Sequence, residues 1–243
     1  MIRIAAVGDI HLGPDNVDAF RDSVRSAQDD ADLLLLAGDL TRHGEVEEAE
    51  LVCRSVSELD LPVVAVLGNH DHHAGCADGF TELLTSSGIT VLEGSSTVVD
   101  VDGCSVGIAG AKGFGGGFAG ACASDFGEPE MKAFVGHTKG IAEQLRRVLA
   151  DLETDVRVAL LHYSPVEDTL RGERLEIFPF LGSYLLAEAI DGAGADLVVH
   201  GHAHAGVEHG MTAGGTRVRN VAMPVIRSSY RVYELDPALS GVS

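Results

Sequence analysis

Short apolar runs alternate with amphipathic segments in the first part of the chain. Ile2–Val7, Leu33–Ala37 and Val63–Leu67 are predominantly apolar and have the length of buried strands. Between these runs, apolar residues recur at the three- and four-residue spacing of a helix face; they are Val17, Phe20, Val24 and Ala27, then Val46, Ala49, Val52 and Val56. Strands that alternate with helices in this way predict parallel pairing through crossover helices.

From the middle of the chain onward the pattern is different. Three short strands are separated by turn residues, which favours antiparallel pairing; they are Val91–Leu92, Thr97–Val101 and Ser105–Ala109. Ile141, Leu145, Val148 and Leu152 mark another helix. Two buried strands (Val156–Leu161, Leu197–Val199) and two edge strands (Thr216–Ala222, Arg231–Leu235) complete the pattern. With no internal repeat or linker, the pattern predicts one α/β domain spanning residues 1–243.

Charge and cysteine content narrow the functional classes. The 17 basic and 37 acidic residues give a net charge of -20, which argues against nucleic acid and anionic membranes as partners. A small phosphate ester stays open, because bound metal ions reverse the local field. Four cysteines without a CxxC pair favour reduced thiols and a cytoplasmic protein. No apolar run is long enough to span a membrane.

Polar side chains follow five of the predicted strands, where each strand ends. The five segments are Gly8–His11, Gly38–Arg42, Gly68–Asp71, His162 and His200–His204. A single aspartate after a strand is usually a turn or cap residue. Open α/β sheets bind ligands at the carboxyl ends of their strands, so five such segments predict one shared site.

The donor types in these segments favour a metal site. In an extended backbone residues i and i+2 point the same way, so Asp9 with His11 and His202 with His204 are expected to face one cavity. Carboxylate, imidazole and amide donors without thiolates suit manganese, iron or zinc, and they are too rich in histidine for calcium.

The ordered blocks D-x-H, G-D-x-x-R, G-N-H-D, H and G-H-x-H, from Asp9 to His204, resemble the calcineurin-like metallophosphoesterase superfamily. The resemblance implies two mixed β-sheets packed as a sandwich and flanked by helices. It also implies two metal ions that share Asp39. One would be bound by Asp9, His11, Asp39 and His204, and the other by Asp39, Asn69, His162 and His202.

The same resemblance implies three residues that act on the substrate or position it. His70 matches the histidine that contacts the phosphate and assists the leaving group, and Asp71 follows it as an expected orienting partner. Arg42 falls at a position that the family fills with aspartate or arginine. A surface charge at the start of a helix is the alternative role for Arg42.

These residues predict a phosphoesterase in which two metal ions, about 3.5–4 Å apart, activate a hydroxide for attack on phosphorus. The modest positive charge of such a centre favours a small phosphodiester, such as a cyclic nucleotide. Phosphomonoesters and phosphoproteins are the alternative substrates. An inactive metal-binding scaffold and a hydrolase of amides are alternatives of other classes.

Several conspicuous residues fall outside the five blocks. His72, His73, His137 and His209 are expected to be ordinary surface histidines, whereas His43 is open between surface and site. The glycine-rich stretch Lys112–Phe118 lacks the ending of a phosphate-binding loop and is expected to be a flexible lid or a connector. Ser164–Ser183, with its apolar run, is open between substrate pocket, core and a homodimer contact.

Overall fold

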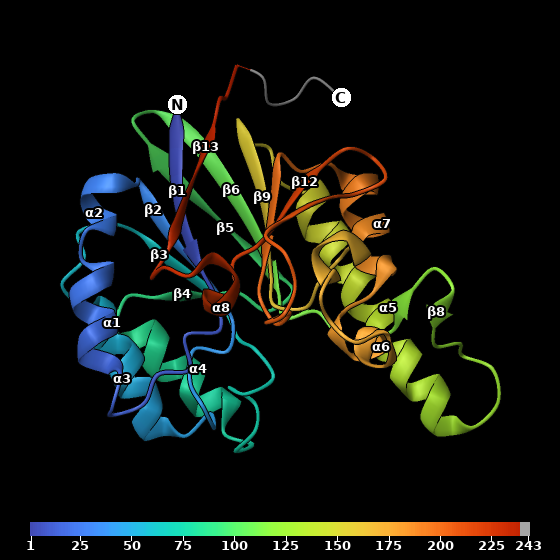
Figure 1. Cartoon of the computed structure of the whole chain (residues 1–243). Helices are drawn as coiled ribbons and strands as arrows, with labels where there is room; N and C mark the ends of the chain where they lie inside the picture. The colour runs from blue at the N-terminus through green and yellow to red at the C-terminus, as the bar shows by residue number, and fades with distance from the viewer. Residues whose placement is uncertain (239–243) are drawn as a thin grey trace.

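The computed structural model describes residues 1–238, so the last five residues of the predicted domain lie outside the described part. Two large β-sheets pack face to face, and helices cover the outer face of each (Figure 1). The layers therefore follow the order helix, sheet, sheet, helix. The predicted fold class is confirmed.

The first sheet has the strand order β13-β1-β2-β3-β4. Its strands are β13 (Arg231–Leu235), β1 (Ile2–Val7), β2 (Leu33–Ala37), β3 (Val63–Val66) and β4 (Thr90–Val91). Strands β1 to β4 are parallel, and β13 is antiparallel to β1 at the edge. The antiparallel pairing expected at Val91 is wrong, because a crossover helix that the pattern did not suggest, α4 (Ala77–Ser86), returns the chain to the same end of the sheet.

The second sheet has the order β11-β12-β10-β9-β6-β5. Its strands are β11 (His209–Met211), β12 (Arg217–Asn220), β10 (Leu197–His200), β9 (Val156–Leu161), β6 (Cys104–Ala111) and β5 (Ser95–Val101). The predicted antiparallel pair is β5 with β6. The segment around β12, expected at an edge, lies inside the sheet because β11 pairs on its outer side.

Helices form the two outer layers. Those of the first sheet are α1 (Val17–Val24), α2 (Ala27–Asp30), α3 (Val46–Val56) and α4. Two helices, α5 (Pro129–Ala150) and α7 (Tyr184–Ala193), cover the second sheet. The shorter elements are β7 (Gly117–Phe118), β8 (Ala121–Cys122), η1 (Glu167–Leu170), η2 (Leu175–Ile177), α6 (Phe178–Leu181) and α8 (Met223–Ile226).

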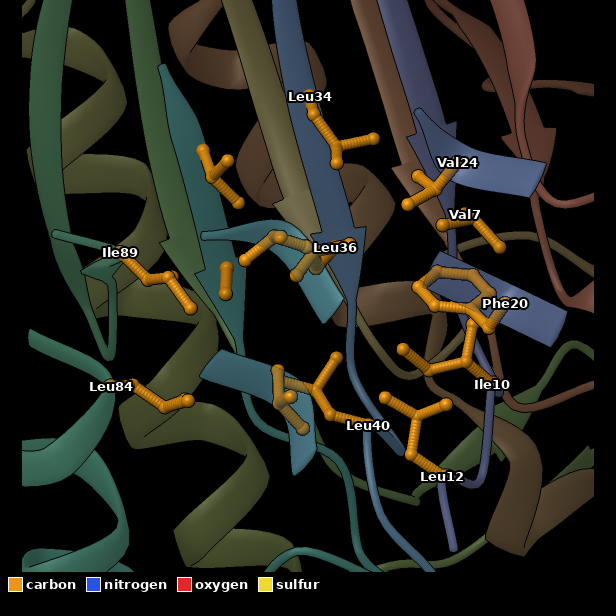
Figure 2. Close-up of a cluster of buried hydrophobic side chains, with 14 of the residues drawn as sticks. Val7, Ile10, Leu12, Phe20, Val24, Leu34, Leu36, Leu40, Leu84 and Ile89 are labelled. Atoms are coloured by element: carbon orange, nitrogen blue, oxygen red, sulfur yellow. The ribbon is translucent and has the colours of Figure 1, made fainter. Parts of the chain in front are cut away.

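Burial on both faces explains the continuous apolar strands. In β1, Ile4 and Ala6 point between the sheets, whereas Ala5 and Val7 point toward the helices. Figure 2 shows the helix side, where Phe20 of α1 lies near Val7. Each layer thus removes apolar area from water on two sides, which stabilises the fold by roughly 25 cal/mol per Å² buried.

Two further features are the absence of a membrane-spanning helix among the described residues and the state of the four cysteines. No helix within residues 1–238 combines the length and the apolar character that crossing a membrane requires. The four cysteines are free thiols, Cys53 and Cys104 being half-buried and Cys76 and Cys122 exposed.

Candidate metal centre

The segments that follow the parallel strands run side by side at one edge of the two sheets. After β1 and β2, the amide of His11 donates to the carbonyl of Asp39 (3.1 Å). After β6 and β9, the amide of His162 donates to the carbonyl of Lys112 (3.0 Å). Strand pairing therefore continues into the loops, and it delivers distant parts of the chain to one place.

Four of the predicted ligands have a left-handed backbone. The φ angles are 56° at Asp9, 43° at His11, 49° at Asp39 and 69° at His202. Residues other than glycine rarely adopt this region, and such strain is typical of functional sites. The extended geometry expected for Asp9–His11 and His202–His204 is wrong, because these turns, not alternation along a strand, direct the side chains.

The seven predicted ligands meet around Asp39. The donor atoms form two groups, and within each group all atoms lie within 4.8 Å of one another. One group comes from Asp9, His11, Asp39 and His204, and the other comes from Asp39, His162 and His202. The carboxamide Oδ1 of Asn69 lies 3.0 Å from Nε2 of His162, beside the second group. Asp39 is the residue that both groups share.

Two glycines make this close approach feasible. A Cβ atom at Gly68 would overlap the carboxylate of Asp39, and one at Gly201 would overlap the carboxylate of Asp9. Hydrogen bonds hold both carboxylates in these positions. The amide of His70 donates to Asp39 (2.9 Å), and the amide of His202 donates to Asp9 (2.9 Å). The glycines of the third and fifth segments are therefore part of the geometry of the site.

The charges at this site fit a divalent cation. The side chains of Asp9 and Asp39 are 0% and 2% exposed, and within residues 1–238 neither pairs with a lysine or arginine. Burial, with help from the Asp39 carboxylate, raises the pKa of Asp9 to about 6. Burial lowers the pKa of His162 and of His202 to about 3, so both imidazoles are neutral and each has a nitrogen lone pair for a metal ion. Buried carboxylates beside neutral imidazoles are an environment that a metal ion would neutralise.

His70 lies at the open side of the cluster. Its side chain is 45% exposed, and its Nε2 lies 4.0 Å from the Asp39 carboxylate. The ring Nδ1 contacts the carbonyl of Arg42 at 2.7 Å. This contact fixes the ring so that Nε2 faces the cluster.

Arg42 turns toward the loop that follows β1. Its guanidinium forms an ion pair with Asp15 (2.7 Å) and donates to the carbonyl of His11 (3.1 Å). The arginine thus stabilises the backbone that carries His11. A contact between Arg42 and substrate stays a prediction.

The carboxylate of Asp71 binds backbone amides and does not contact the ring of His70. The prediction that Asp71 orients His70 is therefore wrong. This buried carboxylate accepts hydrogen bonds from the amides of Leu40 (3.1 Å), Thr41 (2.9 Å) and Gly68 (2.8 Å), and from the Thr41 hydroxyl (2.8 Å). Burial raises the pKa of Asp71 to about 7. The residue joins the loop that carries Asp39 to the loop that carries Asn69.

A sequence model described as Calcineurin-like phosphoesterase matches residues 2–206. The chain belongs to this family. No curated protein matches the chain in sequence. The resemblance seen in the five sequence blocks is therefore confirmed at the level of the family.

Solved structures of low sequence identity share the fold of this family member. The phosphopantetheinyl hydrolase of Mycobacterium tuberculosis is 17% identical, with a TM-score of 0.66 over 98% of this chain and 97% of that chain. A putative 5'-nucleotidase from Staphylococcus aureus is 15% identical, with a TM-score of 0.62 over 98% of this chain and 52% of that one. The protein TT1561 of Thermus thermophilus is 21% identical, with a TM-score of 0.55 over 90% and 88%.

Two residues that are close in sequence to predicted ligands of this phosphoesterase-family chain were not predicted as site residues. The ring of Tyr163 lies 4.3 Å from that of His202, and its hydroxyl has a pKa raised to about 12 by burial and by the Asp39 carboxylate. His200 is fully buried and contacts the Thr169 hydroxyl (2.9 Å). Each is adjacent to a matched block, and this adjacency was the available signal.

The glycine-rich stretch is a connector. The amide of Gly116 donates to the carbonyl of Pro179 (2.7 Å), and that of Gly117 donates to the carbonyl of Gly182 (2.8 Å). Both glycines are buried, which does not fit the alternative of a flexible lid.

The segment Ser164–Ser183 is divided between core and surface. Phe178 and Leu181 join a buried cluster with Phe118. Leu175 and Phe180 are 69% and 60% exposed. The core alternative is thus correct for Phe178 and Leu181. For the exposed residues, a substrate contact and a homodimer contact both stay predictions.

The discounted histidines are exposed, as expected. They are His72, His73, His137 and His209. His43, which was open between surface and site, is also exposed, and its Nδ1 contacts the carboxylate of Glu48 at 3.1 Å. His43 therefore belongs to the surface beside the third helix.

Proposed function

We propose that this protein is a metal-dependent phosphoesterase that hydrolyses a small phosphate ester, with a phosphodiester favoured over a monoester. The observation that carries the proposal is the convergence of seven donor residues from five strand ends in one cluster that has Asp39 in common. Membership of the calcineurin-like phosphoesterase family supports the hydrolysis of phosphate esters.

The donor set fits two metal ions of the manganese, iron or zinc class. Asp9, His11, Asp39 and His204 would hold one ion, and Asp39, Asn69, His162 and His202 would hold the other. When bound, the two ions would supply an activated water and neutralise charge on the phosphoryl group.

His70 would donate a proton to the leaving group. Its Nδ1 is occupied by the carbonyl of Arg42, which leaves Nε2 facing the centre. In the imidazolium form, Nε2–H can donate to the oxygen that leaves phosphorus. The exposure of this ring gives a leaving alcohol a direct path to solvent.

Charge favours a diester. Two divalent ions together with Asp9 and Asp39 retain a modest positive charge, which suits the single negative charge of a phosphodiester. A scaffold without catalysis is disfavoured because every ligand position of the five blocks is filled.

The test is an assay of chelator-stripped protein with bis-p-nitrophenyl phosphate and p-nitrophenyl phosphate. Manganese, zinc, ferrous iron or magnesium is restored in turn. The Asn69→Ala variant, which lacks one predicted metal ligand, is the matched control. We expect metal-restored cleavage, faster for the diester, that the variant lacks. Absence of cleavage of both compounds with two ions bound per chain would contradict the proposal.

A further inference from the structure

A lysine leaves the second sheet directly beside a predicted metal ligand. In the parallel pair of β6 and β9, Ala111 lies opposite Leu161, so the next residues, Lys112 and His162, leave the sheet together. The carbonyl of Lys112 accepts hydrogen bonds from the amides of His162 (3.0 Å) and Tyr163 (2.9 Å). The main chain of Lys112 is thereby fixed relative to the metal centre.

The ammonium group of Lys112 has aromatic neighbours and no direct ion pair among residues 1–238. Its Nζ lies 5.1 Å from the ring centroid of Phe114 and 5.4 Å from that of Tyr163. In the part of the chain that the structure describes, the side chain is half-buried and forms no ion pair. Aromatic faces attract a cation, and the carboxylates of Glu93 and Asp39 act on this ammonium only from beyond ion-pair distance. The ammonium can therefore still form a direct ion pair with an incoming anion.

A cavity of about 660 Å³ opens beside this lysine. His72, Glu93, His137 and Gln144 line it together with Lys112. The Glu93 carboxylate accepts from the backbone amide of Lys112 (3.3 Å) and does not pair with its ammonium. Among the described residues, Lys112 is the only lysine or arginine that lines this cavity.

Tyr163 connects the lysine to the metal centre. Its ring contacts Lys112 on one side, and its centroid lies 4.3 Å from that of His202 and 5.5 Å from that of His162. The hydroxyl forms no hydrogen bond with residues 1–238, and it is not one of the buried polar atoms without a partner, so it reaches solvent although the residue is only 7% exposed. A hydroxyl in this state can donate to an anionic ligand.

We propose that Lys112, held against the ring of Tyr163, forms an anion subsite beside the metal centre. The substrate would then be a phosphate ester that carries a second anionic group, a phosphate or a carboxylate, on the part that enters the cavity. This inference rests on the proposed function, because the first phosphoryl group is taken to lie at the metals.

The test is calorimetric binding to the manganese-loaded protein and needs no turnover. The ligands are α,ω-alkane bisphosphates of increasing chain length, the corresponding alkyl monophosphates, and ω-phosphoalkanoates that carry a carboxylate as the second anion. For one range of linker lengths we expect the second anion to tighten binding about tenfold or more. Comparison of the two second anions shows which of them the subsite takes.

Lys112→Met should remove this gain and leave alkyl monophosphate affinity within about twofold, whereas Lys112→Arg should keep most of it. Lys139→Met is the matched control, because the ammonium of Lys139 pairs with Asp125 on the surface of α5. Melting temperature and metal content establish that each variant is folded and loaded, and Lys112→Gln replaces the methionine variant if that one is not.

Equal affinity for mono- and bisphosphates in the wild type, or a gain that persists in Lys112→Met, would overturn the subsite. The proposed function has a separate readout, the metal-restored cleavage of nitrophenyl esters. A protein that cleaves these esters but lacks the gain refutes the subsite alone. A protein that shows the lysine-dependent gain without cleavage refutes the hydrolase alone.

Discussion

The imidazole Nε2 of His204 lies 2.8 Å from Oδ1 of Asp9, which joins residues 195 positions apart in the chain. The Asp9 side chain is fully buried at this contact, and that of His204 is 44% exposed. A buried carboxylate with an imidazole on its solvent side is an arrangement in which a metal ion can be held between protein and solvent.

Replacement of Asp9 by asparagine should separate metal binding from stability. The raised pKa of Asp9 means that its stabilising contribution is present below pH 4 and is lost as pH rises through about 6. At pH 7.5 the metal-free Asp9→Asn protein should therefore be as stable as metal-free wild type or more so, by up to about 3 kcal/mol. Added manganese should raise the melting temperature of wild type only. A variant that melts lower without metal and still responds to manganese would contradict this assignment.

Metal affinity should weaken in acid. Protonation of Asp9, with a pKa of about 6, competes with the ion, and the pairing with Asp9 that raises the pKa of His204 adds a second competing proton. His162 and His202, with pKa values of about 3, stay neutral and do not contribute in this range. We expect the dissociation constant for manganese to rise about tenfold or more from pH 6 to pH 5. Competition with a chromophoric chelator measures this dissociation constant. A constant affinity from pH 5 to pH 8 would refute the assignment of Asp9 and His204 as metal ligands.

Loss of the Asp71 carboxylate should damage both stability and metal binding. Asp71→Ala leaves buried donors on Leu40, Thr41 and Gly68 without their acceptor, at about 1–3 kcal/mol for each unsatisfied group. Because these donors position Asp39 and Asn69, metal affinity should fall about 10–100-fold. Urea unfolding and metal titration measure the two effects. Glu48→Ala, which removes an acidic side chain bonded to His43, is the control expected to keep metal affinity.

Replacement of Arg42 tests its predicted contact with substrate. If the guanidinium reaches the ester during turnover, Arg42→Ala should raise KM about tenfold while two ions per chain remain bound. Asp15→Ala releases the guanidinium from its ion pair and should not raise KM. Unchanged steady-state constants in Arg42→Ala would assign the arginine to the support of the His11 loop alone.

Several elements were predictable because their signals are local. Apolar runs identified β1, β2, β3 and β9, since strands buried on both faces must be apolar throughout. Crossover helix α4 escaped prediction because its buried residues, Phe80 and Leu84, form too short an apolar stripe. The place of β12 inside the sheet depends on its partner β11, and no local pattern specifies a strand order.

The sequence by itself determined which residues could form the centre, because donor types and their order along the chain are chemical facts of the primary structure. Only the tertiary structure decided how they converge. The left-handed turns at Asp9 and His202, and the attachment of Asp71 to two loops, depend on parallel strands ending at one edge. The place of Lys112 beside His162 likewise follows from strand register. Pairing energies between distant segments set these positions, and such energies leave no local pattern in the chain.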